Sequence, residues 1–455
     1  MDLSGRKPPD AIPDPKATNT PIKLQNGLAT IESRLTMDDK KHFGRIGKEY
    51  PLEMKLEHEY TIELKGTDFE PFLIIKDTTG KPVATGVGKK FARIFFRPAA
   101  AGTHKILATA RAGIARADAP FTLNIREAVL PKDKIEPPLP PGDIAGKPEV
   151  QDGLSVRQLL LGKTRHLASW DRQGKYLFAY DQAGGNLSRI RAADFFREAT
   201  AKHTLLNSNY LAMTMSADGP VLADGKRILL IDPQTLALKK LFQPQSPTMV
   251  VTTAGASSAV GILPGSNPRR DVLFDLKEFT ETPLSGLPAG LVTNFAGRSL
   301  SADGKTFFLA PQNAGVLQRY RLKDAALELA EETKFAVHYP MAIAQRQDGK
   351  YVAPYSLGGR AQEISVFESE RLAKPAFTLP GNTKALCFLE PGGHILTFSG
   401  ELQLFSDAGA KIKSFRWPRS PVYALIPHPT RPAALAMTGQ GVYYLEVTEL
   451  KIAGR

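Results

Sequence analysis

The sequence contains few residues whose type and spacing favour catalysis. Its histidines form no His-x-His or His-x-x-x-His pair of the kind that binds zinc, and they stand at positions 42, 58, 104, 166, 203, 338, 394 and 428. The Gly-x-Ser-x-Gly motif of a nucleophilic serine does not occur. Gly86-Val87-Gly88-Lys89-Lys90 has glycine and lysine without the spacing of a phosphate-binding loop. These patterns favour a non-catalytic protein over an enzyme.

Four further residues have side chains that take part in catalysis or metal binding in other proteins. His166, His338 and His428 lie near predicted inner strands of a repeat. We expect them to bond to backbone or solvent, the alternative being convergence on a central axis. Cys387 is the only cysteine, which excludes a disulfide framework and a thiolate metal site. It lies in an apolar segment, 385–389, and is predicted to be buried.

Loops supply better candidates for binding than for catalysis. Segments 311–315, 357–362 and 438–441 are small and amide-rich, which suits contact with a partner, although the same residues also make ordinary turns. In Arg416-Trp417-Pro418-Arg419 two cations flank an aromatic ring, the composition of a contact hot spot. The alternative, which we favour, is that Trp417 packs between the sixth and seventh repeats. The predicted binding surface comprises Gln312, Asn313, Arg360, Gln362, Arg416, Trp417, Arg419 and Gln440.

A unit of about 42 residues recurs from about residue 154 to the C-terminus and must position these loops. Its clearest copies, 301–309 and 346–352, join two apolar strands through a polar turn with glycine. Gly174, Gly219, Gly304, Gly349 and Gly393 stand 45, 85, 45 and 44 residues apart, and a degenerate copy at 258–275 lies in the double gap. Seven units of four short strands predict a seven-bladed β-propeller.

The last repeat ends too close to the C-terminus to provide a fourth strand of its own. After Leu445-Glu446-Val447 only eight residues remain. The apolar segment 154–160 has no obvious partner and is a candidate for the missing strand. The alternative is that this segment opens the first blade, with 165–170 as the second strand. The sequence leaves both registers open.

The repeat region resembles the WD40-like and YVTN-type bacterial propellers. It departs from the WD40 pattern because Trp170-Asp171 is the sole Trp-Asp pair. The resemblance concerns architecture and carries over no catalytic residue.

The N-terminal part of the chain has a different pattern. Short segments alternate with a period near two and are separated by glycine turns, which predicts a β-sandwich; they are 59–64, 72–77, 92–96, 102–109 and 121–125. In their order and turns these segments resemble the bacterial pre-peptidase C-terminal domain, a jelly-roll-like sandwich. That resemblance implies a calcium site near the first strands, where Asp38 and Asp39 stand. Two adjacent carboxylates are few for an ion that takes six to eight oxygens, so we expect a solvated turn and no cofactor.

These observations predict an all-β protein with a jelly-roll-like sandwich followed by the propeller. The expected parts are a Pro-rich tail at 1–23, the sandwich at 24–128, a Pro-rich linker at 129–150 and the propeller at 151–455. A sandwich of this type before such a propeller is similar to exported proteins of planctomycete-type bacteria.

The composition bears on partners and location. The net charge of +13 is spread in isolated pairs such as Lys239-Lys240, so we expect a protein or an acidic glycan as partner and not a nucleic acid. No apolar run reaches the roughly 18 residues of a membrane span. If a leader was removed, the location is periplasmic, envelope or extracellular; otherwise it is cytoplasmic.

The function we expect is therefore non-catalytic binding or scaffolding in the bacterial cell envelope, through the propeller loops. The alternatives are a lactonase-like or lyase-like propeller enzyme and an accessory or sensory part of an exported hydrolase. The oligomeric state is open.

Overall fold

The computed structural model describes most of the chain as short β-strands. The described residues are 21–56, 58–88, 90–98, 100–111, 118–129, 139–161, 166–182, 184–203, 205, 211–225, 227–243, 249–251, 258–262, 272–276, 280–286, 297–311, 315–335, 342–356 and 363–450. None of them belongs to a helix long and apolar enough to cross a membrane. The chain divides into two compact units: residues 1–137, 226–231 and 237–247 form the first, and residues 138–225, 232–236 and 248–455 form the second.

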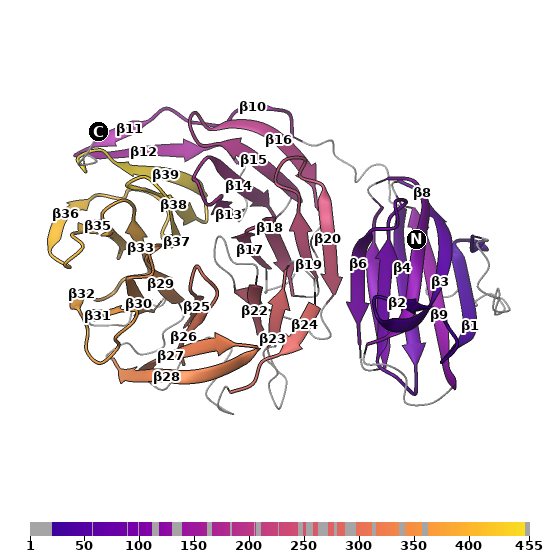
Figure 1. Ribbon diagram of the computed structural model, residues 1–455. Helices are drawn as coiled ribbons and strands as arrows, with labels where there is room; N and C mark the ends of the chain where they lie inside the picture. The colour runs from indigo at the N-terminus through magenta and orange to yellow at the C-terminus, as the bar shows by residue number, and fades with distance from the viewer. Residues whose placement is uncertain are drawn as a thin grey trace. The chain divides into compact units, whose positions relative to one another are not determined.

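The first unit contains two antiparallel sheets (Figure 1). One has the order β1-β9-β4-β7, with β1 at Leu28–Thr36, β9 at Asp118–Val129, β4 at His58–Gly66 and β7 at Phe91–Phe96. The other has the order β2-β3-β8-β5-β6, with β2 at Lys41–His42, β3 at Arg45–Met54, β8 at Gly102–Ala110, β5 at Pro71–Lys76 and β6 at Pro82–Val87.

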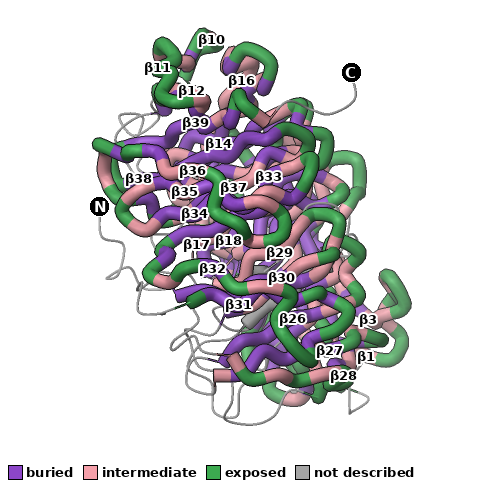
Figure 2. The backbone as a smooth tube through the Cα atoms, turned by 90° about the vertical axis from the view of Figure 1, so that its left-hand side faces the viewer, coloured by how far each residue is buried: buried purple, intermediate pink, exposed green. Residues whose placement is uncertain are grey.

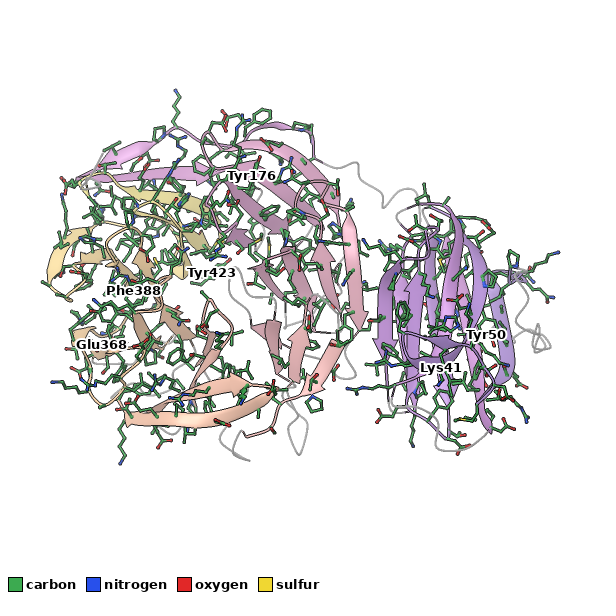
Figure 3. All side chains as sticks on the ribbon, viewed as in Figure 1. Lys41, Tyr50, Tyr176, Glu368, Phe388 and Tyr423 are labelled. Carbon is green, nitrogen blue, oxygen red and sulfur yellow. The ribbon has the colours of Figure 1, made fainter. Side chains whose placement is uncertain are left out.

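Alternation of side chains along these strands produces the core of the first unit. In β9, Ala119, Phe121, Leu123 and Ile125 are buried, while the residues between them point to the other face. Tyr50 of β3, labelled in Figure 3, packs edge-to-face on Phe121 with ring centroids 6.4 Å apart, so the two sheets share one apolar layer.

Described strands that follow residue 165 come in consecutive sets. The first three sets are β13 (His166–Trp170), β14 (Tyr176–Asp181), β15 (Asn186–Arg191) and β16 (Phe196–Lys202); β17 (Leu211–Ser216), β18 (Gly219–Asp224), β19 (Ile228–Ile231) and β20 (Leu238–Gln243); and β21 (Met249–Val251), β22 (Ser258–Ile262), β23 (Val272–Asp275) and β24 (Thr280–Pro283). Strands β22 and β23 occupy the degenerate copy inferred from the sequence.

The remaining sets continue with the same antiparallel order. They are β25 (Gly297–Leu300), β26 (Thr306–Ala310), β27 (Val316–Lys323) and β28 (Ala326–Lys334); β29 (Ala342–Gln345), β30 (Tyr351–Tyr355), β31 (Glu363–Glu368) and β32 (Phe377–Pro380); β33 (Ala385–Leu389), β34 (His394–Phe398), β35 (Leu402–Phe405) and β36 (Lys411–Phe415); and β37 (Val422–Pro427), β38 (Ala433–Thr438) and β39 (Gly441–Val447).

These sets are arranged as a ring (Figure 1). The first strand of each set lies nearest the centre in Figure 1, and β13, β17, β21, β25, β29, β33 and β37 contact one another in chain order. Figure 2 shows buried residues along strands such as β34 and β38, with exposed residues gathered at the turns. Burial on both faces of each sheet explains the nearly continuous apolar composition of strands such as Ala385–Leu389.

The ring closes through a strand that precedes the first set. Strand β12, Leu154–Leu159, pairs antiparallel with β39 and completes the last sheet, and β11, Glu149–Gln151, pairs with β12. The structure thereby decides the register that the sequence left open, because β13 is the innermost strand of the first set. Within the segment predicted to be a linker, β10, Gly142–Asp143, also pairs with β16.

The recurring glycine turn has a local physical cause. Between β25 and β26, Asp303 Oδ1 accepts a hydrogen bond from the Lys305 N–H at 3.0 Å, and Gly304 has φ +73°. Between β29 and β30, Asp348 Oδ1 accepts from the Lys350 N–H at 2.8 Å, and Gly349 has φ +76°. The aspartate fixes the turn, and glycine takes the left-handed conformation that other residues adopt at a cost.

Candidate functional site

A groove of about 390 Å³ lies at the turn end of the first two sets in the ring. Three turns build it: those between β13 and β14, between β17 and β18, and between β19 and β20. Successive turns of an antiparallel meander alternate between the two ends of a sheet, so the predicted binding loop at 438–441, between β38 and β39, belongs to the opposite end. The groove is therefore a site that the sequence interpretation missed.

The first turn is also held by an aspartate, but Asp171 stands where the fourth set has Ser301, whose Oγ accepts from the Thr306 N–H at 2.8 Å. Asp171 Oδ1 accepts from the N–H of Tyr176 at 2.9 Å, and the Gly174 N–H donates to the Asp171 carbonyl at 3.0 Å. Gly174 has φ +67°, which favours glycine. This turn carries the exposed side chains of Arg172 and Lys175 to the rim.

Tyr176 stands in the wall of the groove, at the start of β14 (Figure 3). Lys175 Nζ lies 5.3 Å from the centroid of its ring, and Arg189 Cζ of β15 lies 5.2 Å from the same centroid. Both cations interact with the π-face of the ring, and these contacts restrict its rotation. The tyrosine is thus a fixed element of the groove.

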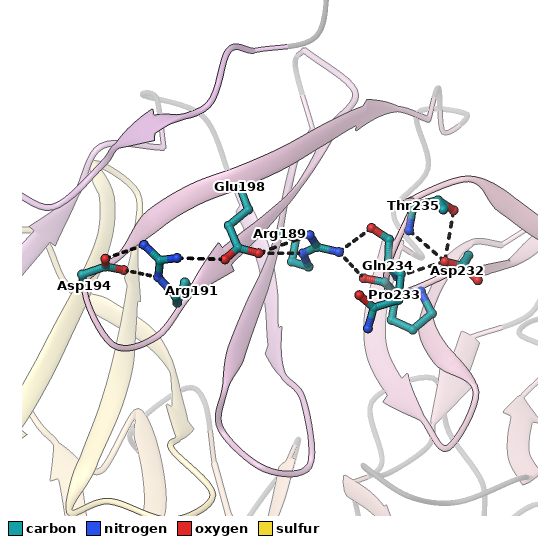
Figure 4. A network of polar contacts seen from close by, with 8 residues as sticks. All are labelled: Arg189, Arg191, Asp194, Glu198, Asp232, Pro233, Gln234 and Thr235. Atoms are coloured by element: carbon teal, nitrogen blue, oxygen red, sulfur yellow. Dashed lines mark hydrogen bonds and ion pairs between the residues drawn. The ribbon is translucent and has the colours of Figure 1, made fainter.

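Arg189 joins the first set to the turn between β19 and β20 (Figure 4). Its Nη1 donates to the carbonyls of Pro233, at 3.1 Å, and Gln234, while its Nε donates to Glu198 Oε2 at 3.2 Å. Asp232 Oδ1 in turn accepts from the Gln234 N–H at 2.9 Å. Every edge of the guanidinium is thereby engaged, and the far wall of the groove is fixed in place.

Glu198 also links this network to the protein surface. Its Oε1 accepts from Arg191 Nη1 at 3.2 Å, and Arg191 Nη2 lies 2.7 Å from Asp194 Oδ2. The hydrogen bond from Arg191 holds the pKa of Asp194 below its ordinary value. Arg189 and Arg191 are thus paired with carboxylates and act as supports, which leaves Arg172 and Lys175 as the rim cations.

We predict that Arg189→Met lowers the free energy of unfolding of the ring by about 2 kcal/mol, because it removes charge-assisted hydrogen bonds from a side chain that is only 14% exposed. Arg191→Met is the control, and we expect a much smaller loss because that side chain is 41% exposed and its ion pair is screened by water. Urea unfolding followed by tryptophan fluorescence measures both. Equal effects of the two substitutions would contradict the supporting role of Arg189.

The floor and the rim of the groove differ in chemistry. Phe178 and Met215 are buried at the floor, and the exposed amides of Gln173 and Gln234 stand with the rim cations. An apolar floor with a few polar groups around it is the usual composition of a binding pocket. Within the described part of the chain, no three His, Cys, Asp or Glu side chains gather in a way that would hold a metal ion.

Several predicted binding residues lie elsewhere. Trp417 is buried, its Nε1 donates to the Ser420 carbonyl at 2.8 Å, and its ring packs on Tyr443 with centroids 5.4 Å apart. Arg419 Cζ lies 5.2 Å from the Trp417 ring and its guanidinium pairs with Glu149. The tryptophan thus packs among the sixth and seventh sets, as in the alternative interpretation of this motif.

The other predicted residues divide into two groups. Arg416 and Gln440 are exposed, and the Gln440 N–H donates to Thr438 Oγ1 at 3.1 Å. Gln312, Asn313, Arg360 and Gln362 lie outside the described residues. The predicted loop surface therefore stays a prediction.

The calcium candidates form a turn in the first unit. Asp39 Oδ2 accepts from the Thr36 N–H at 2.7 Å, and the Asp39 N–H donates to the Thr36 carbonyl at 3.1 Å. One carboxylate oxygen of the Asp38-Asp39 pair is therefore committed to the backbone. The expectation of a calcium site there stays untested.

Two of the three singled-out histidines are described, and both are buried. His166 lies on β13, and His428 follows β37 and contacts the Gly174 carbonyl through Nε2 at 3.1 Å. His338 lies outside the described residues. Cys387 is also buried, and burial raises its pKa. His428 thus bonds to the backbone, and Cys387 is an unreactive core thiol.

Comparison with known proteins supports the architecture. No protein-family model matches the sequence, and no curated protein matches it. Among solved structures, the β-propeller domain of Cps50 (Swd1) from Myceliophteria thermophila is similar, with a TM-score of 0.52 and 14% sequence identity. The match covers 63% of this chain and 98% of that one. The chain contains a β-propeller. The prediction of an all-β protein with a propeller is confirmed, and at this identity the likeness concerns the fold alone.

Proposed function

We propose that this chain is a non-catalytic scaffold whose propeller holds an extended segment of a partner protein in the groove at Tyr176. The groove carries this proposal because its walls are fixed before a partner arrives: Arg189 engages two carbonyls, a carboxylate and the Tyr176 ring. Such preorganisation reduces the entropy that binding would otherwise lose.

The chemistry of the groove indicates what kind of segment fits. Phe178 and Met215 offer an apolar floor for one anchoring side chain, and Arg172 and Lys175 offer positive charge beside it. Asp171, the carboxylate of the lining, is engaged by the Tyr176 N–H. An apolar residue flanked by Asp or Glu meets both requirements, since burial of the anchor gives affinity and the acidic neighbours give orientation.

A location in the bacterial cell envelope is part of the proposal. It is supported by the resemblance of residues 59–123 to the pre-peptidase C-terminal domain, whose members accompany secreted enzymes. Mass spectrometry of the native N-terminus together with cell fractionation tests this part separately. An unprocessed protein recovered with cytoplasmic markers would remove the envelope from the proposal and leave the groove unaffected.

We predict that Arg172→Glu combined with Lys175→Glu lowers recovery of the partner at least tenfold in quantitative pull-downs with the full chain, because it reverses the charge of the rim. The source is an extract of the cells that make the protein. Lys350→Glu is a matched control: Lys350 Nζ lies 5.0 Å from the Tyr351 ring in the equivalent turn of the fifth set, outside the groove lining.

A protein retained by the wild type and by Lys350→Glu, and lost with the double substitution, is the expected result. Recovery of the same proteins by all three baits, or of none by the wild type, would contradict binding at this groove. Circular dichroism of the baits shows whether the double variant is folded. Added salt should weaken the complex of the wild type with its partner, because it screens the rim charges.

A further inference from the structure

The first unit has a groove of its own, about 730 Å³ in volume, on one face of the sheet β1-β9-β4-β7. The strand registers place four side chains in one row across it. Glu32 of β1 is opposite Thr122 of β9, Thr122 is opposite Lys65 of β4, and Lys65 is opposite Phe91 of β7. Neighbouring strands lie about 4.8 Å apart, so the row spans about 14 Å.

Phe91 is an exposed aromatic ring that its neighbours hold in place. It is 47% exposed, and Arg93 Cζ lies 5.2 Å from its ring centroid. Arg93 Nε donates to Glu63 Oε2 at 2.7 Å, which fixes the guanidinium. The ring is therefore an apolar platform that loses little conformational entropy when a ligand stacks on it. Pro120, also exposed, adds a second apolar surface in the same groove.

The charged groups of this face are nearly balanced. Arg34 pairs with Asp118, and Lys65 Nζ lies 3.0 Å from Glu63 Oε1, so the other charges of the lining are one exposed cation, Lys90, and one exposed carboxylate, Glu32. Glu32 brings an exposed carboxylate into the groove itself. A polyanion gains little from lysine and arginine side chains that already have carboxylate partners, and Glu32 repels it.

The same row offers both donors and acceptors. The Lys65 ammonium donates, the Glu32 carboxylate accepts, and the Thr122 hydroxyl does either. A pyranose ring matches this pattern, since each of its hydroxyls donates and accepts while its C–H face stacks on an aromatic or proline ring.

We propose that this groove binds an uncharged polysaccharide strand, with sugar rings stacked on Phe91 and Pro120 and hydroxyls bonded to Glu32, Thr122 and Lys65. The site is separate from the groove at Tyr176 and shares no residue with it. It gives the first unit a binding role of its own.

Titration calorimetry of the full chain with cellohexaose, xylohexaose and mannohexaose tests this site. We expect at least one oligomer to bind, and Phe91→Ala to weaken that binding about tenfold or more. Phe43→Ala is the matched control, because Phe43 is another exposed phenylalanine of the first unit, 59% exposed and outside the groove lining. We expect no change from that substitution. Circular dichroism checks that both variants are folded.

Three results would overturn the proposal: no binding of any of the oligomers at millimolar concentration, equal binding by wild type and Phe91→Ala, or tighter binding of polygalacturonate or polyglutamate than of the uncharged oligomers. The last result would assign the face to an acidic polymer. Phe91 does not line the groove at Tyr176, so protein capture at that groove should be the same in Phe91→Ala, which separates the two proposals.

Discussion

Val156→Asp is expected to lower the free energy of unfolding of the propeller by about 4 kcal/mol, because it buries an unpaired carboxylate at the closure of the ring. Val156 lies on β12, is opposite Leu445 of β39 and is 4% exposed. It packs in the apolar cluster that also contains Leu154 and Trp417. The variant should both create a buried charge and weaken the strand that completes the last sheet.

Tryptophan fluorescence reports on the ring alone in this experiment. The chain has two tryptophans, Trp170 and Trp417, and both belong to the second unit. Urea unfolding followed by their emission therefore separates the ring from the first unit, whose unfolding need not coincide with it. Hydrogen exchange of the amides in β39 gives a second reading, and their protection should fall in the variant because β12 is their pairing partner.

Gln158→Asp is the matched control for this prediction. Gln158 lies two residues further along β12, on the same face as Val156, and is exposed. A surface substitution of this kind should change stability by about 0.5 kcal/mol or less. If Val156→Asp does not fold, Val156→Ala, with an expected loss of about 2 kcal/mol, replaces it. A loss at position 156 as small as that expected at position 158, about 0.5 kcal/mol, would show that the propeller does not depend on this strand.

The closing strand also shows where sequence interpretation reaches its limit. The alternating apolar pattern of 154–160 predicts a strand, and the structure has β12 at Leu154–Leu159. The pattern does not name the partner, because an amphipathic strand fits any open sheet edge with the same alternation. The pairing joins residues nearly 300 positions apart, from Leu154 to Val447, and only the closed ring brings them together.

The glycine turns of the repeats are easier to predict from sequence than some of the strands. The turn with Gly304 has its signal in consecutive residues, since aspartate, glycine and lysine set the backbone locally. In the first unit, segments such as 59–64 and 121–125 were recognised by alternation and lie in β4 and β9. The residues of β3, Arg45–Met54, include Pro51 and several charges and do not predict a strand; they form one because pairing with β8 outweighs local propensity.

The two candidate sites illustrate the same limit. Arg416-Trp417-Pro418-Arg419 stands out in the sequence, but the sequence does not indicate that the Trp417 ring is buried against Tyr443. The groove at Tyr176 has the opposite character. Its lining comes from three turns in two repeats, each of ordinary turn composition, and only their juxtaposition makes a site. The one local signal was the exposed Lys175 beside Tyr176.

His428 is expected to make the stability of the propeller sensitive to acid. Its Nε2 lies 3.1 Å from the Gly174 carbonyl, and its Nδ1 accepts from the Thr430 N–H at 3.2 Å. This pattern requires the neutral ring with its proton on Nε2, because a proton on Nδ1 would meet the Thr430 donor. Burial, and then the charge of Arg431, lower the pKa of His428 to about 4.

The direction of the pH effect follows from the two protonation states. In the unfolded chain the histidine has an ordinary pKa near 6.5, so between about pH 6.5 and 4 the unfolded chain binds more protons than the folded one. The contribution of His428 to the free energy of unfolding is complete above pH 6.5 and is lost as the pH falls to about 4. At about 1.4 kcal/mol for each unit of pKa, the loss is about 3 kcal/mol.

His428→Gln should remove this part of the acid sensitivity, because a glutamine amide can still donate to the Gly174 carbonyl and does not titrate. Urea unfolding at several pH values between 7 and 4 measures the difference in slope between wild type and variant. His203, whose pKa burial also lowers, and the carboxylates contribute equally to both proteins and cancel. The centroids of the Trp170 and His428 side-chain rings are 4.6 Å apart. Protonated His428 should therefore quench the emission of Trp170 in the wild type as the propeller loses stability. If the free energy of unfolding falls with pH equally in wild type and variant, His428 does not make the propeller sensitive to acid.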